Sequence, residues 1–309
     1  MNPAPLAARP LEALNRVLAS VDAVRNGAAV YALLATFAAA GLLLAMAESA
    51  FGRNAPAWGT LWGGASLTTL FYGSNATGLL LFDQARGLAP RALGAALADA
   101  LATAHRLLLV LLCVAGLACA LLAGLAAALW LTRAPLVGPA LFGLLLPAAV
   151  VVVGVAMLAS AAVLAPLAAP AIWSGHGVVA ALALLGQHVR QRLLLVALLM
   201  SAVSGLAALV GALLTFAVMT GGRVVAAMAV LIAGIDLPPQ TLMAGLFGHG
   251  LRSLGAAGAP AAQSAYGQAA LAGGGVVFML ALVLPALVYL RGTCAVYLAL
   301  EERDDGRPQ

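Results

Sequence analysis

The chain has 309 residues, of which 64% are hydrophobic and only 8% charged, and its mean hydropathy is +1.08. A soluble domain of this length could not bury so much apolar surface, so the composition excludes an ordinary globular protein and predicts that lipid is part of its solvent. The net charge of +5 comes from arginines that stand in ones and twos at the ends of apolar runs, with little aromatic interleaving. A nucleic-acid partner is therefore not expected.

Several apolar runs are long enough for membrane-spanning helices, since about 20 residues at about 1.5 Å each cross the hydrocarbon layer. The alternation of a β-barrel is missing. We predict an all-α, polytopic integral membrane helix bundle of about six transmembrane helices, forming a single membrane domain over residues 27–300. The predicted spans cover residues 28–47, 61–82, 107–131, 138–164, 193–219 and 278–300.

Amphipathic stretches outside these spans predict interfacial helices. The first occupies residues 1–26, where an apolar stripe recurs at helical spacing. Two elbow helices are expected at the cytoplasmic interface, over residues 88–105 and 174–192. Residues 301–309 form a charged tail. The stripe of the first helix consists of Leu11, Leu14, Leu18, Val21 and Val24.

Two segments depart from the simple pattern of spans. Residues 136–172 carry no charge and are too long for one straight span, and Pro147, Pro166 and Pro170 are expected to kink or end the helix there. Residues 224–235 form an apolar run of only 12 residues before Asp236 and Pro238. That run is predicted to be re-entrant, interfacial or packed on the bundle.

The distribution of arginine sets the predicted orientation. With alternate sides of the membrane, eleven arginines fall on the side of both termini and both elbows, and four fall on the other side. By the positive-inside rule the two termini are cytoplasmic, and the protein is a multi-pass protein of the bacterial inner membrane. The four external arginines are Arg53, Arg133, Arg223 and Arg252.

A short repeat also appears in the chain. The run Arg106-Leu-Leu-Leu-Val110 recurs as Arg192-Leu-Leu-Leu-Val196, each after an amphipathic stretch, with an offset of about 86 residues. Because both copies point the same way, the pattern predicts a parallel internal repeat of span, elbow and span.

The layout resembles that of a known group of bacterial membrane proteins. The resemblance covers about residues 10–303 and includes Gln84-Ala-Arg86-Gly87, the elbow leading to Arg106, residues 166–177, and Tyr297-Leu298 before a charged tail. These features are similar to the YciC-like proteins and to the membrane domain attached to glycerophosphodiester phosphodiesterases. The resemblance implies a six-helix membrane domain without an established activity. The chain departs from the phosphodiesterases because it shows no soluble catalytic barrel.

Polar residues inside predicted spans are the candidate site. Such groups are costly in hydrocarbon and usually face a bundle interior or a cavity. Thr68, Thr69, Ser74 and Asn75 lie in the second span, where hydrogen bonding between helices is the plainer explanation. Arg291 is the one charge within the last apolar stretch, and it either snorkels to the headgroups or pairs inside the bundle, with Asn75 as a candidate partner.

The remaining titratable residues do not converge in sequence, so no catalytic, metal or cofactor residues are assigned and an enzyme is not expected. His105, His176 and His188 border the elbows. The three cysteines form no CxxC motif and are expected to be packing residues.

Two functions stay open for a non-enzymatic membrane protein of this kind. A polar second span, parallel repeats and the short run at residues 224–235 suit membrane transport or permeation. Three cytoplasmic amphipathic helices suit a membrane scaffold or accessory subunit that organises lipid or docks a partner. The expected partners are membrane lipids, together with a partner protein or a second copy of the chain.

Overall fold

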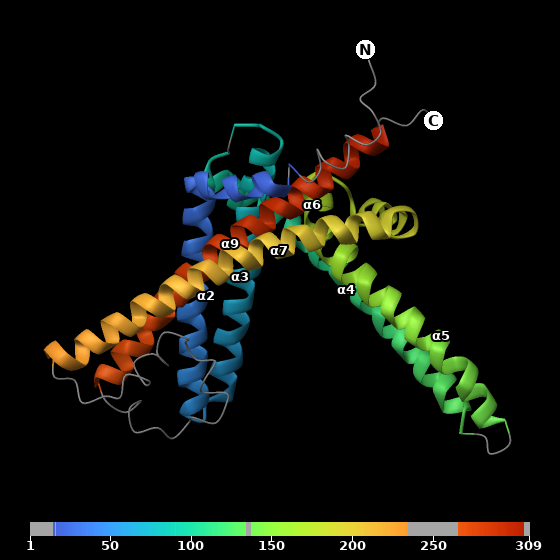
Figure 1. The fold of residues 1–309 in the computed structure, drawn as a ribbon, viewed down its shortest axis with the longest axis horizontal. Helices are drawn as coiled ribbons and strands as arrows, with labels where there is room; N and C mark the ends of the chain where they lie inside the picture. Colours follow the sequence, from blue (N-terminus) through green and yellow to red (C-terminus); the bar gives the residue numbers. More distant parts are fainter. Residues whose placement is uncertain (1–14, 16, 90, 134–136, 234–264, 306–309) are drawn as a thin grey trace, which may run out of the picture. The chain divides into compact units, whose positions relative to one another are not determined.

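The protein is all-helical over the part of the chain that its computed structural model describes, which comprises residue 15 and residues 17–89, 91–133, 137–233 and 265–305. Figure 1 shows the helices in sequence colours. In chain order they are η1 (Ala19–Arg25, a 3₁₀ helix), α2 (Gly27–Gly52), α3 (Pro56–Ala85), α4 (Leu93–Leu131), α5 (Gly138–Ala159), η2 (Ser160–Leu164, a π-helix), α6 (Ala165–Trp173), α7 (Val178–Ala233) and α9 (Ala265–Asp305).

Five of the described helical segments are long and apolar enough to cross a membrane. The expectation of an all-α helical membrane bundle is thus confirmed. Helix α3 has the length of a span, with 30 residues, but it is more polar and is not among the five. The sixth crossing therefore stays a prediction. The five segments are Gly27–Gly52, Leu93–Leu131, Gly138–Trp173, Val178–Ala229 and Leu280–Glu302.

The chain divides into two compact units, each made of segments distant in sequence. Unit 1 comprises Met1–Ser20, Gly78–Val203 and Leu290–Gln309. Unit 2 comprises Val21–Thr77 and Ser204–Tyr289. Helices α3, α7 and α9 each contribute one part to either unit, so residues on one helix can belong to different units.

Unit 1 is built around the C-terminal end of α3. The ring of Phe82 lies 6.2 Å from the ring of Trp173 in α6 and 6.3 Å from that of Tyr297 in α9, between ring centres. Helix α6 packs on α4. The largest fully buried side chains of this unit are Val17, Leu80, Leu81, Phe82, Val110, Val163, Leu167, Leu185, Tyr297 and Leu300.

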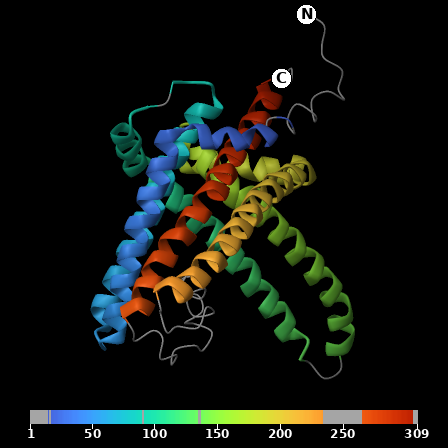
Figure 2. The same ribbon diagram turned by 60° about the vertical axis from the view of Figure 1, so that its left-hand side comes forward.

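The hairpin of α4 and α5 projects from this core with little cover. Figures 1 and 2 both show the two green helices side by side. None of the residues in the most apolar stretch of Gly138–Trp173 is buried by the rest of the protein. Water would strongly disfavour such a surface, whereas lipid tails solvate it well.

Unit 2 contains the hairpin of α2 and the first part of α3. Small residues let these helices approach closely, because a Cβ atom added at Gly73 would overlap the side chain of Thr36. Ser66 Oγ donates a hydrogen bond to the Ala40 carbonyl at 2.7 Å, which joins the two helices directly. In the same unit, α7 and α9 meet where Gly211 lies against Pro285.

The end of α3 follows the rules for helix termination. The N–H of Leu88 donates to the Asp83 carbonyl at 2.9 Å, and that of Gly87 donates to the Gln84 carbonyl at 3.1 Å. Gly87 has φ +72°, which is the left-handed conformation this cap requires and which glycine adopts without strain. The cap reverses the chain and brings Arg91 back beside α3.

Helix α4 differs from the predicted sequence of elbow and span. It runs from Leu93 to Leu131 as one helix, so the boundary expected near Arg106 lies inside it. The leucine stripe that suggested a separate elbow is equally compatible with the first turns of a longer helix, since both have the same periodicity.

Helix α7 changes conformation at one predicted boundary and is continuous at another. Arg192 has φ −140° and ψ 20°, a non-helical conformation at the expected junction of the second elbow and fifth span. The helix then continues to Ala233, so the fifth predicted span and the first part of the short run at residues 224–235 belong to one helix. Asp236 and Pro238, which were expected to stop the short run, lie outside the described residues.

The fourth apolar run is one continuous helical segment from Gly138 to Trp173 instead of a span ending at residue 164. Pro147 lies inside α5. A π-helical turn at Ser160–Leu164 precedes Pro166, and the Ala165 N–H donates to the Ser160 carbonyl, five residues back. The wider turn accommodates a proline that has no N–H and would clash with the carbonyl of a regular helix.

The described part of the N-terminal stripe is exposed, and its place at the membrane interface stays a prediction. Leu18, Val21 and Val24 are all exposed, and the spacing of three residues between Val21 and Val24 places those two on one edge of the 3₁₀ helix η1. Leu11 and Leu14 lie outside the described residues, as does most of the charged tail. Helix α9 extends through Asp305.

Candidate functional site

The polar residues of the second predicted span lie on α3 in unit 2 and hydrogen-bond largely to their own helix. Thr68 and Thr69 donate to the Ala65 carbonyl at 2.9 and 2.8 Å. The Asn75 side-chain amide donates to the Phe71 carbonyl at 2.9 Å. These bonds satisfy the donors without any ligand.

Exposure further separates these four residues. Asn75 is buried, with 4% of its surface exposed, whereas Thr68 is exposed and Thr69 and Ser74 are half-buried. The structure therefore does not bring all four to one enclosed face. Asn75 is the member that lies inside the protein.

Arg291 belongs to unit 1, where it lines a pocket along α9. The residue is half-buried, and its Nη1 atom is fully buried. Because Asn75 belongs to the other unit, their proposed pairing stays a prediction. Arg291 is thus the candidate residue that the structure places at a cavity.

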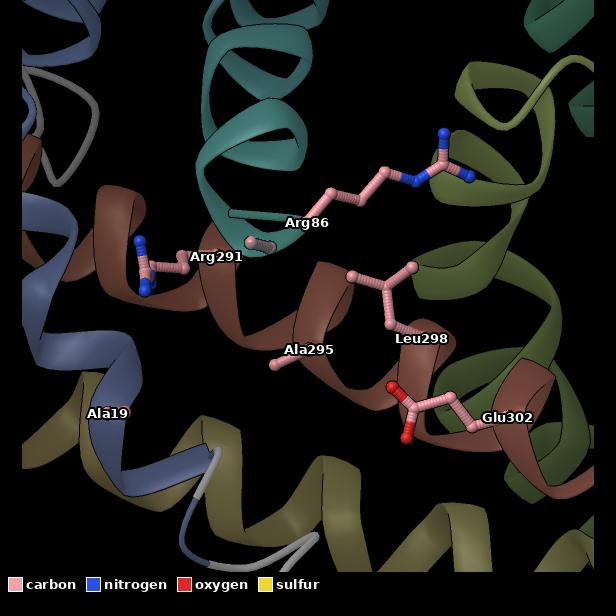
Figure 3. Close-up of a pocket in the computed structure, with 7 residues that line it drawn as sticks. Ala19, Arg86, Arg291, Ala295, Leu298 and Glu302 are labelled. Carbon is pink, nitrogen blue, oxygen red and sulfur yellow. The ribbon is translucent and has the colours of Figure 1, made fainter. Parts of the chain in front are cut away.

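The pocket has a volume of about 370 Å³ and is partly open. One stripe of α9 lines it, with residues spaced by four, three and four positions along the helix. Figure 3 shows Arg291 and Glu302 at the two ends of this stripe. The lining residues are Ala19, Ala85, Arg86, Arg291, Ala295, Leu298 and Glu302.

Arg86 reaches the pocket from the end of α3. Its guanidinium carbon lies 4.3 Å from the centre of the Phe82 ring, within the range of a cation–π contact. In Figure 3 the guanidinium groups of Arg86 and Arg291 point in opposite directions. The charged groups closest to the α9 stripe are therefore Arg291 at one end and Glu302 at the other.

Ser174, His176 and Tyr297 form a hydrogen-bonded cluster in the same unit, next to the Phe82 ring that Tyr297 contacts. Ser174 Oγ lies 2.7 Å from His176 Nδ1 and 2.9 Å from the Tyr297 hydroxyl, and it donates to the Ala171 carbonyl at 2.8 Å. Because the Ser174 hydroxyl donates its hydrogen to the Ala171 carbonyl, we place a hydrogen on Nδ1 of His176, which then donates to Ser174 Oγ. In that state Nδ1 cannot accept a proton from Ser174, as nucleophilic catalysis would require.

The turn between α3 and α4 contains a close ion pair that is partly buried. Arg91 donates to both carboxylate oxygens of Asp83, at 2.6 and 2.7 Å, and to Asp99 at 2.6 Å. The Asp83 side chain is 7% exposed and that of Asp99 is 53% exposed. The hydrogen bonds to Asp83 are the main reason that the pKa of Arg91 is raised above its ordinary value.

This triad ties the beginning of α4 to the end of α3. Each carboxylate is used by the guanidinium, so the arrangement is suited to fixing the turn. Sequence reasoning placed Asp83 and Asp99 apart because it could not foresee the chain reversal at Gly87.

The described residues contain no group of three or more histidine, cysteine or acidic side chains that could hold a metal ion. Cys113 and Cys119 are exposed and Cys294 is buried, and all three are free thiols. His188 is buried on α7, while His176 belongs to the serine cluster described above.

The α9 stripe was not predicted, although its spacing is visible in the sequence. Arg291, Ala295, Leu298 and Glu302 recur at the spacing of one helical face. In the sequence these residues look like an ordinary helix face. They line a pocket only because η1 and the end of α3, which are distant along the chain, lie beside them. Comparison with protein-family models, with curated proteins and with solved structures gave no match.

Proposed function

We propose that this chain is a non-enzymatic membrane scaffold or accessory subunit of the bacterial inner membrane. It would contact lipid through its uncovered spans and interfacial helices, with both termini in the cytoplasm. The resemblance to the YciC-like superfamily is part of this proposal.

The observation that carries the proposal is how the polar groups of α3 are used. Transport would require polar side chains to line a hydrated route through the spans. Thr68, Thr69 and Asn75 instead donate to carbonyls of their own helix, and Ser66 joins α3 to α2. Donors engaged in this way stabilise a bundle and leave less capacity for a moving solute.

A second observation points to lipid as the main partner. The apolar surfaces of α4 and α5 are almost entirely uncovered, and the N-terminal residues Leu18, Val21 and Val24 present a further apolar edge. An apolar edge beside charged residues is typical of helices that lie in the headgroup region.

Thiol labelling would separate the scaffold from a transporter. Ser74→Cys would be introduced after replacement of the three native cysteines by alanine, with Asn54→Cys in the exposed turn between α2 and α3 as the matched control. The scaffold predicts that a membrane-impermeant maleimide, applied to solubilised protein, labels Asn54→Cys and leaves Ser74→Cys unreacted. Equal labelling rates at the two positions would indicate a hydrated route and contradict the proposal.

A further inference from the structure

We propose that the junction at Arg192 is a conformational switch: α7 is bent there while Arg192 binds α9, and it becomes one straight helix when that contact is released. The switch does not depend on whether the protein is a scaffold or a transporter, since it concerns the packing of unit 1 alone. Helices α4 and α7 contain the same five-residue run, and α7 is bent at the start of its copy.

The shared run is fully compatible with a continuous helix. In α4 the run that begins at Arg106 lies well inside a helix of 39 residues. In α7 the identical run begins at Arg192, whose φ of −140° and ψ of 20° mark a kink between two helical stretches. Arginine and leucine are good helix formers, and the run contains neither proline nor glycine, the residues at which helices usually kink. The bend in α7 therefore has a cause outside the run.

The buried face of α7 stays in register across the bend. Buried residues before and after the junction recur every three or four positions, with position 192 filling the gap between the two sets. A straight α7 would therefore carry the same residues along one continuous face, so straightening does not turn an apolar residue to the opposite side. The buried residues are Ala181, Leu185, His188, Val196, Leu199 and Val203.

The two arginines differ in their position relative to the buried face of their helix. Arg106 is exposed, beside the buried residues Ala104 and Leu107. Arg192 lies in line with the buried face and is half-buried. A charged group in such a position needs hydrogen-bond acceptors, because its desolvation is costly. One of these acceptors is the Leu300 carbonyl of α9, which lies 3.4 Å from Arg192 Nη1 and ties the junction to a distant helix.

A second pivot lies at the other end of residues 178–191. Gly175 has φ +101°, a conformation that favours glycine, and a Cβ atom added at Gly177 would meet nothing within 4 Å. The turn is also held by α9, because Ser174 Oγ lies 2.9 Å from the Tyr297 hydroxyl. Residues 178–191 are thus a helical segment between two pivots, and rotation at the glycines can accommodate straightening at the junction.

Double electron–electron resonance on the full chain in lipid nanodiscs measures the bend. The three native cysteines would be replaced by alanine, and spin labels attached at Val179→Cys and Leu198→Cys, two exposed positions 19 residues apart across the junction. Leu93 and Leu112 are the matched pair in α4, since they are also exposed and 19 residues apart. A straight helix places such positions about 28 Å apart. We expect that distance in α4 and a shorter one in α7, and equal distances would overturn the proposal.

Replacement of the arginine tests what holds the bend. Arg192→Leu should lengthen the α7 distance to that of the α4 pair, because leucine completes the apolar face and cannot bind the Leu300 carbonyl. Arg106→Leu is the matched control and should leave both distances unchanged. An unchanged α4 distance in Arg192→Leu would show that unit 1 is still folded. A short α7 distance in that folded variant would overturn the proposal.

Two further variants separate a switch from a gradual bend. Arg192→Ala removes the contact without placing a large side chain beside α9, and it should also give the long α7 distance. Arg192→Lys keeps a charged donor but has different reach and geometry, so it should weaken the contact and populate both distances. A single intermediate distance in Arg192→Lys would indicate a gradual bend and contradict the switch.

Discussion

Replacement of Asp83 by asparagine should destabilise the protein much more than the same change at Asp99. Both carboxylates bind Arg91, but Asp83 accepts two hydrogen bonds and is 7% exposed, whereas Asp99 accepts one and is 53% exposed. Loss of one partner from a buried ion pair costs about 3–5 kcal/mol. An exposed pair contributes about 0.2–1 kcal/mol.

The expected losses of stability lie between these two limits, because the Arg91 side chain is neither fully buried nor fully exposed. Its side chain is 30% exposed and would retain Asp99 as a partner in the Asp83→Asn variant. We therefore expect Asp83→Asn to lower the free energy of unfolding by roughly 1.5–3 kcal/mol. Asp99→Asn should lower it by less than about 1 kcal/mol.

Equilibrium unfolding in mixed micelles, followed by circular dichroism as the mole fraction of dodecyl sulfate rises, measures this difference. The pKa of Arg91 is raised in the folded protein, so the stabilisation is complete below the ordinary arginine pKa and is lost only as pH rises through the raised value. The difference between variants should thus remain constant from about pH 7 to about pH 10. An equal or larger loss in Asp99→Asn would refute the reasoning.

Three further substitutions, one of them with a matched control, test the structure of each unit. In unit 2, Gly73→Ala should lower the free energy of unfolding by about 1–3 kcal/mol, because the added Cβ would overlap the side chain of Thr36. The control Gly63→Ala adds a Cβ that meets nothing within 4 Å, so in the same micelle assay it should change stability by less than about 0.5 kcal/mol. Similar losses for the two variants would contradict the close approach of α2 and α3. In unit 1, Tyr297→Phe should cost about 0.5–1.5 kcal/mol, since it removes the hydroxyl group 2.9 Å from Ser174 Oγ, and an unchanged unfolding midpoint would count against that bond. Arg291→Leu should leave membrane insertion intact, judged by carbonate extraction, but lower the unfolding midpoint, because the guanidinium has a buried Nη1 atom and is engaged by the rest of the protein. An unchanged midpoint would show that Arg291 only snorkels to the headgroups.

The existence of the long helices could be predicted because their apolar runs exceed the thickness of the membrane. That requirement acts on composition and does not depend on tertiary contacts. The junction at Arg192 was also predictable, because polar residues concentrate there between two leucine-rich stretches. The structure places a non-helical residue at that position.

The boundary near Arg106 shows where the same reasoning fails. The two runs that begin at Arg106 and Arg192 have identical residues, yet α4 passes through the first without a break while α7 changes conformation at the second. Local sequence is therefore insufficient to decide whether the helix is interrupted. Contacts from distant segments contribute, such as the bond from Arg192 Nη1 to the Leu300 carbonyl at 3.4 Å.

The candidate site was predicted only in part for a related reason. Arg291 was identifiable because a charge within an apolar stretch is costly. Glu302 looked like part of a charged tail, and its relation to Arg291 depends on helix α9 continuing through both residues. The Arg91 triad likewise depends on the chain reversal at Gly87, whose left-handed conformation places residues from two helices together.

The central claim is that the chain crosses the membrane several times with both termini in the cytoplasm, and reporter fusions test it most directly. Alkaline phosphatase and green fluorescent protein would be fused after Arg53, Arg133 and Gln309. The account predicts phosphatase activity after Arg53 and Arg133, and fluorescence without phosphatase activity after Gln309. Phosphatase activity after Gln309 would contradict it.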